Sequence, residues 1–190
     1  MKKIKIGFAM CGSFCTFDDS IKQLERLVSG GYDVTPIMSF NAYSIDTRFG
    51  KAADFVRRIE QICGRPVIRT IEGAEPAGPG KLYELVLVSP CTGNTLAKLA
   101  NSITDTPVTM AVKSQIRNSR PALIAISTND ALSGNSRNIG VLLNSKNYYF
   151  VPLHQDDPHK KPTSLIANFE LIPSAAEAAL NGLQLQPMFV

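Results

Sequence analysis

The residues best suited to chemistry are the small polar side chains Thr92, Asn94 and Thr95, which lie between two regular patterns. The apolar run at residues 85–88 precedes them and is typical of a buried strand, and apolar residues recur at helical spacing after them. The first N–H groups of such a helix have no partner within the helix and carry partial positive charge, so this turn is suited to an anion. The same hydroxyl and amide groups could instead cap the helix without a ligand, and the spacing leaves both interpretations open.

Two further turns of this kind, at residues 11–13 and 39–41, follow the apolar runs 4–10 and 32–38. Open α/β sheets bind ligands beyond the carboxyl ends of their strands, so we expect the three turns to meet at one edge. Their small, uncharged side chains suit a phosphate held by dipoles better than one held by a metal ion. The predicted binding residues are Gly12, Ser13, Ser39, Asn41, Ser89, Pro90, Thr92, Asn94 and Thr95.

The elements that must position these turns are strands that alternate with helices. Strands are expected at residues 4–10, 32–38, 67–71, 85–88, 122–126 and 148–151. Helices are expected at residues 16–28, 47–63, 94–102, 107–118, 138–144 and 174–180. Because the strands are almost continuously apolar, the pattern predicts an α/β fold, a three-layer αβα sandwich in which helices cover both faces of a mainly parallel sheet.

The chain has 190 residues, which is enough for one full core, and we expect a single domain over residues 1–190. The strand–helix pattern ends near residue 152, and residues 154–162 are polar and rich in turn-forming types. We therefore predict that residues 152–190 form a C-terminal loop or arm, suited to an interface, with one short helix. The Pro- and Gly-rich residues 73–80 are also expected to form a loop.

Composition excludes several classes of function. The net charge is only +4, and Lys and Arg are scattered without a block, so nucleic-acid binding is not expected. No apolar segment is long enough to span a membrane. The four cysteines form no CxxC pair, and no secretory pattern precedes the first strand. We therefore expect a cytoplasmic protein with free thiols and no structural metal site.

Two common nucleotide-binding motifs are incomplete or absent. Gly7 and Gly12 have the spacing of a P-loop, but Ser13 stands where the motif needs Lys to reach the phosphates. A GxGxxG turn is absent after the first expected strand, so direct binding of a nicotinamide dinucleotide is not expected.

Three further side chains have two interpretations each. His154 and His159 flank two aspartates and could ligate a metal ion, but their proline-bounded segment favours a solvated or interface loop. Cys91 stands at the start of an expected helix, where a thiolate would be stabilised, although packing of a small residue explains it equally well.

Taken together, the three turns resemble a known family. Gly12-Ser13, Ser39 and the segment 90–95 (Pro-Cys-Thr-Gly-Asn-Thr) resemble the flavoprotein family that includes phosphopantothenoylcysteine decarboxylase, peptidyl-cysteine decarboxylases and flavin prenyltransferase. The resemblance covers roughly residues 3–151 and implies a Rossmann-like sheet. It also implies FMN, with its phosphate held by the loops after the first, second and fourth expected strands, and a homotrimer or higher oligomer with flavin near an interface between protomers.

The chain departs from the residues that serve the best-known reactions of this family. Residues 41–50 contain no His, which the decarboxylases carry after the second strand. Thr128-Asn129 replaces the Arg-Glu pair of the prenyltransferases, and Met110 replaces another of their arginines. Neither the decarboxylase nor the prenyltransferase reaction is therefore implied by these positions.

One branch of the family resembles the chain over nearly its whole length. The resemblance is carried by residues 43–50 (Tyr-Ser-Ile-Asp-Thr-Arg-Phe-Gly), residues 127–132 (Ser-Thr-Asn-Asp-Ala-Leu) and the tail 150–165. It implies a sporulation protein of the mother-cell cytoplasm that works with a separate, nicotinamide-binding protein to oxidise a reduced ring precursor to an aromatic dicarboxylate. Two alternatives remain: a non-catalytic partner of that nicotinamide-binding protein, with a vestigial flavin site, and another flavin-dependent decarboxylase.

A small dicarboxylate substrate needs cations for its carboxylates and a flat apolar surface for its ring. The cations nearest to the binding turns in sequence are Arg48, Lys113, Arg117 and Arg137, each of which could equally be a solvated surface charge. No catalytic base can be assigned, and Tyr43 and Asp46 are only guesses.

Overall fold

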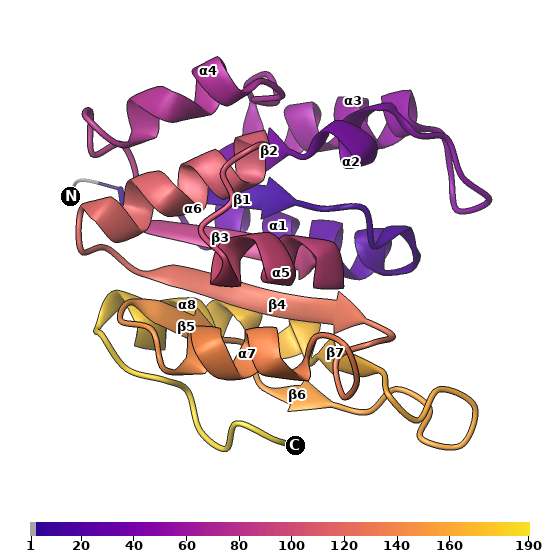
Figure 1. Cartoon of the computed structure of the whole chain (residues 1–190). Helices are drawn as coiled ribbons and strands as arrows, with labels where there is room; N and C mark the ends of the chain where they lie inside the picture. Colours follow the sequence, from indigo (N-terminus) through magenta and orange to yellow (C-terminus); the bar gives the residue numbers. More distant parts are fainter. Residues whose placement is uncertain (1–2) are drawn as a thin grey trace.

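The computed structural model describes residues 3–190, which form a seven-stranded sheet between two layers of helices (Figure 1). The strand order is β2-β1-β3-β4-β7-β6, and β5 pairs with β4 beside this path. The strands are β1 (Lys5–Met10), β2 (Asp33–Met38), β3 (Leu85–Cys91), β4 (Ala122–Thr128), β5 (Tyr148–Phe150), β6 (Leu153–His154) and β7 (Leu165–Ala167). The first five strands pair in parallel, and β7 pairs antiparallel with β4 and β6.

Helices lie on both faces of the sheet. α1 and α8 pack together on one face, while α5, α6 and α7 cover the other (Figure 1). The helices are α1 (Phe17–Ser29), α2 (Phe40–Ser44), α3 (Ala52–Cys63), α4 (Ile71–Ala74), α5 (Gly93–Ala100), α6 (Pro107–Arg117), α7 (Ser136–Leu143) and α8 (Ile172–Leu180), with 3-10 turns η1 (Phe14–Thr16), η2 (Glu75–Ala77) and η3 (Phe169–Leu171). The predicted Rossmann-like αβα sandwich is confirmed.

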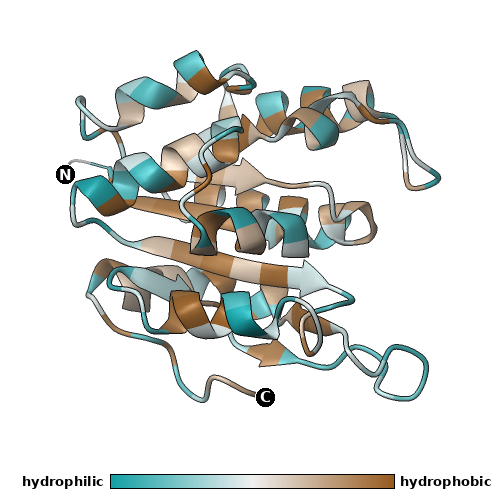
Figure 2. Cartoon of the chain, in the orientation of Figure 1, coloured by the Kyte–Doolittle hydropathy of each residue, from teal (hydrophilic) through white to brown (hydrophobic). Residues whose placement is uncertain are grey.

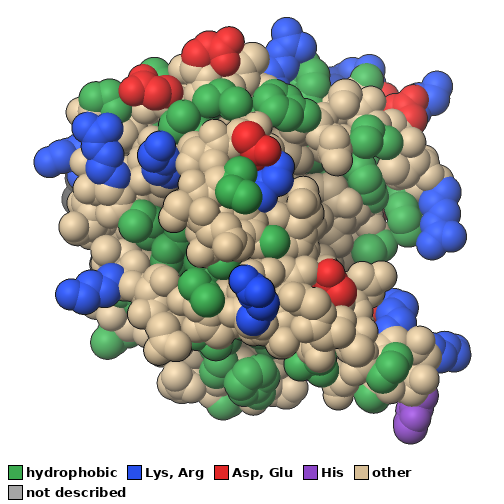
Figure 3. Space-filling model, in the orientation of Figure 1, with side chains coloured by type: hydrophobic (Ala, Val, Ile, Leu, Met, Phe, Trp, Pro, Cys, Tyr) green, Lys and Arg blue, Asp and Glu red, His purple; other side chains and the backbone are tan. Residues whose placement is uncertain are grey.

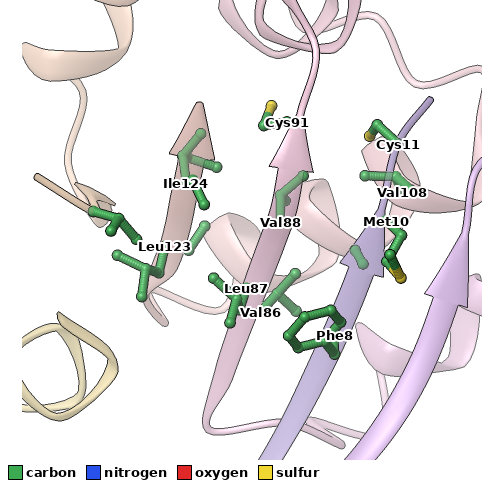
Figure 4. Packing of buried hydrophobic residues seen from close by; sticks show 14 of the residues in the cluster. Phe8, Met10, Cys11, Val86, Leu87, Val88, Cys91, Val108, Leu123 and Ile124 are labelled. Atoms are coloured by element: carbon green, nitrogen blue, oxygen red, sulfur yellow. The ribbon is translucent and has the colours of Figure 1, made fainter. Parts of the chain in front are cut away.

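The core lies along the central strands because their side chains are apolar on both faces. Every residue of β3 is buried, and Figure 2 shows the brown hydrophobic bands of β3 and β4 enclosed by the helix layers. Phe8, Leu87 and Ile124 come from three neighbouring strands and pack in this core (Figure 4). Burying one such side chain contributes about 1.5–3 kcal/mol. This core holds the carboxyl ends of β1, β3 and β4 in fixed positions.

The helix predicted over residues 47–63 begins five residues later than expected, at Ala52. Thr47 and Gly50 exchange backbone hydrogen bonds in a tight turn, and Gly50 has φ +151°. The Asp46 carboxylate then accepts a hydrogen bond from Ala52 N at 2.9 Å and satisfies a free donor at the helix start. The turn expected at residues 39–41 is instead the start of the short helix α2, because Ser39 caps it.

The strand expected at residues 67–71 is reduced to one bridge, between Ile37 and Ile68. On the N-terminal side of Ile68, Pro66 has no N–H group to continue the pairing with β2. On the C-terminal side, β2 itself ends at Met38. The loop expected at residues 73–80 contains the end of α4 and the turn η2.

The segment predicted to be an irregular arm contains the two short strands β6 and β7. They extend the sheet beyond β4, so the loop between them lies next to the carboxyl end of β4 (Figure 1). The expected C-terminal helix is α8, which begins at Ile172 and is followed by Gly182 at φ +73°. Among the described residues, no helix combines the length and the apolar character that crossing a membrane requires.

Candidate functional site

The turns after β1, β2 and β3 meet at the carboxyl edge of the sheet and line one pocket of about 300 Å³, which we call the loop pocket. Six residues predicted to bind an anion line it: Gly12, Ser39, Asn41, Thr92, Asn94 and Thr95. The convergence follows from the parallel pairing of β1 with both β2 and β3, which places their carboxyl ends side by side. A ligand in this pocket would contact three segments that are distant in the sequence.

Hydroxyl groups fix the local backbone of the loop pocket. Thr92 caps α5 by accepting a hydrogen bond from Thr95 N at 3.3 Å. Ser39 caps α2 by accepting from Ala42 N at 3.3 Å. The capping interpretation is therefore realised at both turns. Asn94 remains exposed at the start of α5, where its side chain faces the pocket without serving as the cap.

A partly buried polar network formed by Thr128, Asp130 and Asn135 packs against the first turn of α5. Thr128 Oγ1 donates to Asp130 Oδ1 at 2.6 Å, and Asn135 Nδ2 donates to Asp130 Oδ2 at 2.7 Å. A Cβ atom at Gly93 would lie 2.5 Å from both Asn135 Nδ2 and Asp130 Oδ1. Only glycine leaves room for this approach, so Gly93 lets the first turn of α5 rest directly on the network.

Lys98 and Asp105 are functional candidates that sequence reasoning missed. Both line the loop pocket, and the Lys98 ammonium lies 2.9 Å and 2.8 Å from the two Asp105 oxygens. Lys98 follows Asn94 by four residues, which places both side chains on the same face of α5. That spacing was the available signal for a cation beside Asn94 in this pocket.

A second pocket of about 510 Å³ adjoins the loop pocket and shares Gly12 and Thr92 with it. We call it the outer pocket. Ser13, another predicted binding residue, lies here, and its hydroxyl is 2.8 Å from that of Ser127 on β4. The outer pocket is also lined by Cys15, Phe49, Asn129, Asp156, Lys161, Ser164, Leu165 and Ile166.

Ser89 and Pro90 lie in the interior, at the end of β3. The Ser89 hydroxyl is 3.0 Å from that of Ser20 on α1, and the Pro90 carbonyl accepts a hydrogen bond from Cys11 N at 3.1 Å. The first contact joins β3 to α1, and the second joins the residue after β1 to the end of β3. Neither Ser89 nor Pro90 lines the loop pocket or the outer pocket, so the structure does not bring these two predicted binding residues to the site.

The structure does not bring the four predicted substrate cations together. The Arg48 guanidinium carbon lies 4.9 Å from the centre of the Phe49 ring, and Phe49 lines the outer pocket. Lys113 and Arg117 line a different pocket of about 240 Å³ between α5 and α6, which shares no lining residue with the loop pocket. Arg137 is exposed on α7.

Two buried thiols lie near this edge of the sheet: Cys11, which lines the loop pocket, and Cys91 at the end of β3. Figure 4 shows Cys11 and Cys91 at the carboxyl ends of β1 and β3, beyond core residues such as Val88. Burial raises the pKa of Cys11 to about 11, although a hydrogen bond from Thr95 opposes the shift. Burial also raises the pKa of Cys91 well above its usual value, and the neighbouring Cys11 adds a smaller shift in the same direction. These environments favour neutral, packed thiols over a reactive thiolate.

His154 lies on β6, and His159 is exposed in the loop that follows it. Within residues 3–190, the side chains of His, Cys, Asp and Glu form no group of three or more that could hold a metal ion.

The Flavoprotein family model matches residues 1–161 of the chain, and the chain therefore belongs to this family. The chain is also 46% identical to the B subunit of dipicolinate synthase from Bacillus subtilis (strain 168), over all of this chain and 95% of that protein. The crystal structure of the corresponding B subunit from Bacillus halodurans matches it with a TM-score of 0.91 at 41% identity, covering 100% of this chain and 98% of the other. The resemblance found in the sequence is thus confirmed at the level of the family and of this branch.

Solved structures of lower identity share the fold. An FMN-dependent cysteine decarboxylase, SpaF, has a TM-score of 0.65 at 21% identity and covers 94% of this chain and 95% of its own. DmrB from Burkholderia xenovorans, a cubic cage crystallised with FMN, has a TM-score of 0.69 at 17% identity and covers 94% of this chain and 96% of its own.

Proposed function

We propose that this chain binds FMN at the carboxyl edge of its sheet and acts as the flavin-binding subunit of a dipicolinate synthase. One observation carries the proposal: six residues that the sequence predicted to bind an anion converge from three loops on the loop pocket. Membership of the Flavoprotein family supports a flavin as the cofactor. The names of the relatives support dipicolinate as the product and a partner, the A subunit of dipicolinate synthase.

The donor set of the loop pocket fits a phosphate group. Thr92, Ser39 and Asn94 offer neutral hydroxyl and amide groups, and the eight-residue helix α5 directs its free N–H groups to the same place. The Lys98 ammonium is paired with Asp105, which also lines the pocket, so a bound phosphate would take the place of the Asp105 carboxylate on Lys98. A Cβ atom at Gly12 would lie 3.6 Å from Asn41 Cβ, so glycine keeps the pocket from narrowing. We therefore assign the phosphate to the loop pocket.

FMN, when bound, would supply an acceptor for two electrons in the oxidation of a reduced ring precursor. The chain's own residues would bind the phosphate, orient the cofactor through the rigid ends of β1 and β3, and present the substrate beside it. The nicotinamide site is assigned to the partner, the A subunit, in keeping with the missing GxGxxG turn here.

The substitution Asn94→Asp tests the phosphate assignment. It places a negative charge at the start of α5 beside a dianion, and we expect FMN to bind at least about tenfold more weakly, a loss of about 1.4 kcal/mol. Asn101→Asp is the matched control, because Asn101 lies at the opposite end of α5 and does not line the loop pocket. Titration of FMN fluorescence measures both. Equal affinity of the two variants would remove Asn94 from the site.

We further propose that the chain assembles as a homotrimer or higher oligomer in the mother-cell cytoplasm of a spore-forming bacterium. Support for assembly comes from Ile103, Val141 and Leu143, which are exposed near or on α5 and α7. On this face, apolar side chains lie among isolated charges rather than within a charged patch (Figure 3). The same scattering of Lys and Arg argues against a nucleic-acid partner.

Two other functions make different predictions. A non-catalytic partner of the A subunit would bind that protein without retaining FMN. A separate flavin-dependent decarboxylase would retain FMN and release carbon dioxide without any partner. We favour the synthase function because the similarity to the B subunit of dipicolinate synthase extends over the whole chain.

A further inference from the structure

The outer pocket is bounded by three separate parts of the chain. Its floor is formed by the turn after β1 and the end of β4, one wall carries Phe49, and the opposite wall is the loop between β6 and β7. In Figure 1 these segments all lie on the side of the sheet to which the carboxyl ends of β1 and β4 point, with the loop before α3 above and the loop between β6 and β7 below. The volume of about 510 Å³ is in the range of small-molecule sites, and the shared Gly12 and Thr92 place the pocket directly beside the loop pocket.

Among the described residues that line the outer pocket, Lys161 is the one cation. Its ammonium pairs with the Asp156 carboxylate at 2.7 Å, and both side chains remain partly open to solvent. The hydrogen bond that Lys161 donates to Asp156 raises the pKa of Lys161, which favours the charged ammonium. Solvent screens an exposed pair of this kind, so another carboxylate can replace Asp156 at little cost.

The backbone around Lys161 is held independently of that ion pair. Lys161 N donates to the Asp157 carbonyl at 2.7 Å. Thr163 Oγ1 donates to the Asn129 carbonyl at 2.7 Å, and Ser164 Oγ donates to the Thr128 carbonyl at 3.3 Å. The loop is thus attached to the residues that follow β4, which keeps the Lys161 ammonium at the mouth of the pocket.

The remaining surface of the outer pocket suits a flat ring. Phe49 supplies an aromatic face, and Leu165 and Ile166 supply apolar side chains. Asn129 adds a neutral amide. A planar ring that carries carboxylates would find apolar contact for the ring and charge-assisted hydrogen bonds for one carboxylate.

We propose that the outer pocket binds the dicarboxylate substrate beside the flavin, and that Lys161 binds one of its carboxylates in exchange for Asp156. This assignment rests on the proposed function, because a flavin in the loop pocket is what makes the neighbouring pocket a substrate site. It makes Lys161 a residue that determines substrate specificity. Lys113 and Arg117 do not compete for the role, because they line a different pocket.

Cys15 provides a probe of this pocket that needs neither activity nor flavin. Its thiol is exposed and lines the outer pocket, whereas Cys11 and Cys91 are buried and Cys63 is partly buried. The experiment measures the rate at which iodoacetamide modifies Cys15, by peptide mass spectrometry, as pyridine-2,6-dicarboxylate is added. We expect saturable protection, with alkylation slowed about fivefold or more at saturation.

Three substitutions then test Lys161. We expect Lys161→Gln to raise the half-protecting concentration about tenfold, as loss of a charge-assisted hydrogen bond implies. Lys160→Gln, the matched control, removes a neighbouring charge that does not line the pocket and should change this concentration less than about twofold. Asp156→Asn should lower it about threefold, because the competing carboxylate is gone.

Several results would overturn the proposal. One is the absence of protection, and another is equal behaviour of Lys161→Gln and Lys160→Gln. A third is a pair of observations: FMN alone protects Cys15 completely, and the dicarboxylate displaces FMN from the protein. Together they would make the outer pocket part of the flavin site. In the first two cases a parallel FMN titration, expected to be unchanged by Lys161→Gln, shows whether the proposed function survives. Saturable protection without FMN binding would instead keep the dicarboxylate site and refute the flavin proposal.

Discussion

The substitution Gly93→Ala should destabilise the protein because the site rests on a close approach of α5 to a polar network. An added Cβ would lie 2.5 Å from Asn135 Nδ2 and Asp130 Oδ1, and 2.8 Å from Thr128 Oγ1. These atoms are held by hydrogen bonds to one another, and Asn135 is buried, so they cannot move aside independently.

The size of the effect follows from three contributions. Overpacking of a tight contact costs about 1–3 kcal/mol. Distortion of a hydrogen bond to a charged carboxylate costs about 1.5–3 kcal/mol when the bond is lost. Alanine recovers up to about 1 kcal/mol through its higher helix propensity. Because the hydrogen bond is distorted rather than lost, only part of the second cost applies, and we expect a net loss of about 2–3 kcal/mol in the free energy of unfolding.

Urea unfolding followed by circular dichroism measures this loss, at one protein concentration because assembly changes apparent stability. With an m-value of about 2–3 kcal/mol per molar, the midpoint should fall by about 1 M. Gly140→Ala is the matched control: Gly140 lies within α7, nothing lies within 4 Å of its added Cβ, and the variant should gain about 0.5–1 kcal/mol. A Gly93→Ala variant as stable as the wild type would refute the idea that the network fixes α5.

Two further predictions concern the two pockets. At pH 8, iodoacetamide should modify Cys15 and leave Cys11 intact, because Cys11 is buried and its pKa of about 11 leaves roughly one thiol in a thousand ionised. Peptide mass spectrometry measures both thiols, and early modification of Cys11 would show that the loop pocket opens. Arg48→Gln should raise the concentration of dicarboxylate that half-protects Cys15 about three- to tenfold, since the Arg48 guanidinium lies over the ring of Phe49, which lines the outer pocket. An unchanged concentration would place Arg48 outside the substrate site.

Local patterns were sufficient for β3 and α5, which carry the turn at one side of the loop pocket, but they missed the short helix α2, which carries Asn41. The apolar run before Ser89 and the spacing of Leu96 and Leu99 predicted a strand, a turn and a helix, which are β3 and α5. Gly64 ended a predicted helix correctly because it adopts the left-handed conformation, with φ +65°. The parallel topology then explains why turns far apart in sequence meet.

Other features depend on contacts that local patterns do not contain. Asp46 sets the start of α3 from six residues away, so the helical pattern alone placed that start too early. The strands β6 and β7 have two and three residues, and they form because β7 pairs with β4 and β6 pairs with β7. For the same reason Lys161 was missed, since only this pairing brings it beside the turn after β1.

The most direct test of the flavin proposal is the visible absorption spectrum of the purified protein after addition of FMN and gel filtration. We predict flavin bands that elute with the protein, and their loss or strong weakening in Asn94→Asp but not in Asn101→Asp. A wild-type protein that elutes without colour would contradict flavin binding, and would favour a partner of the A subunit that has kept the fold without the cofactor.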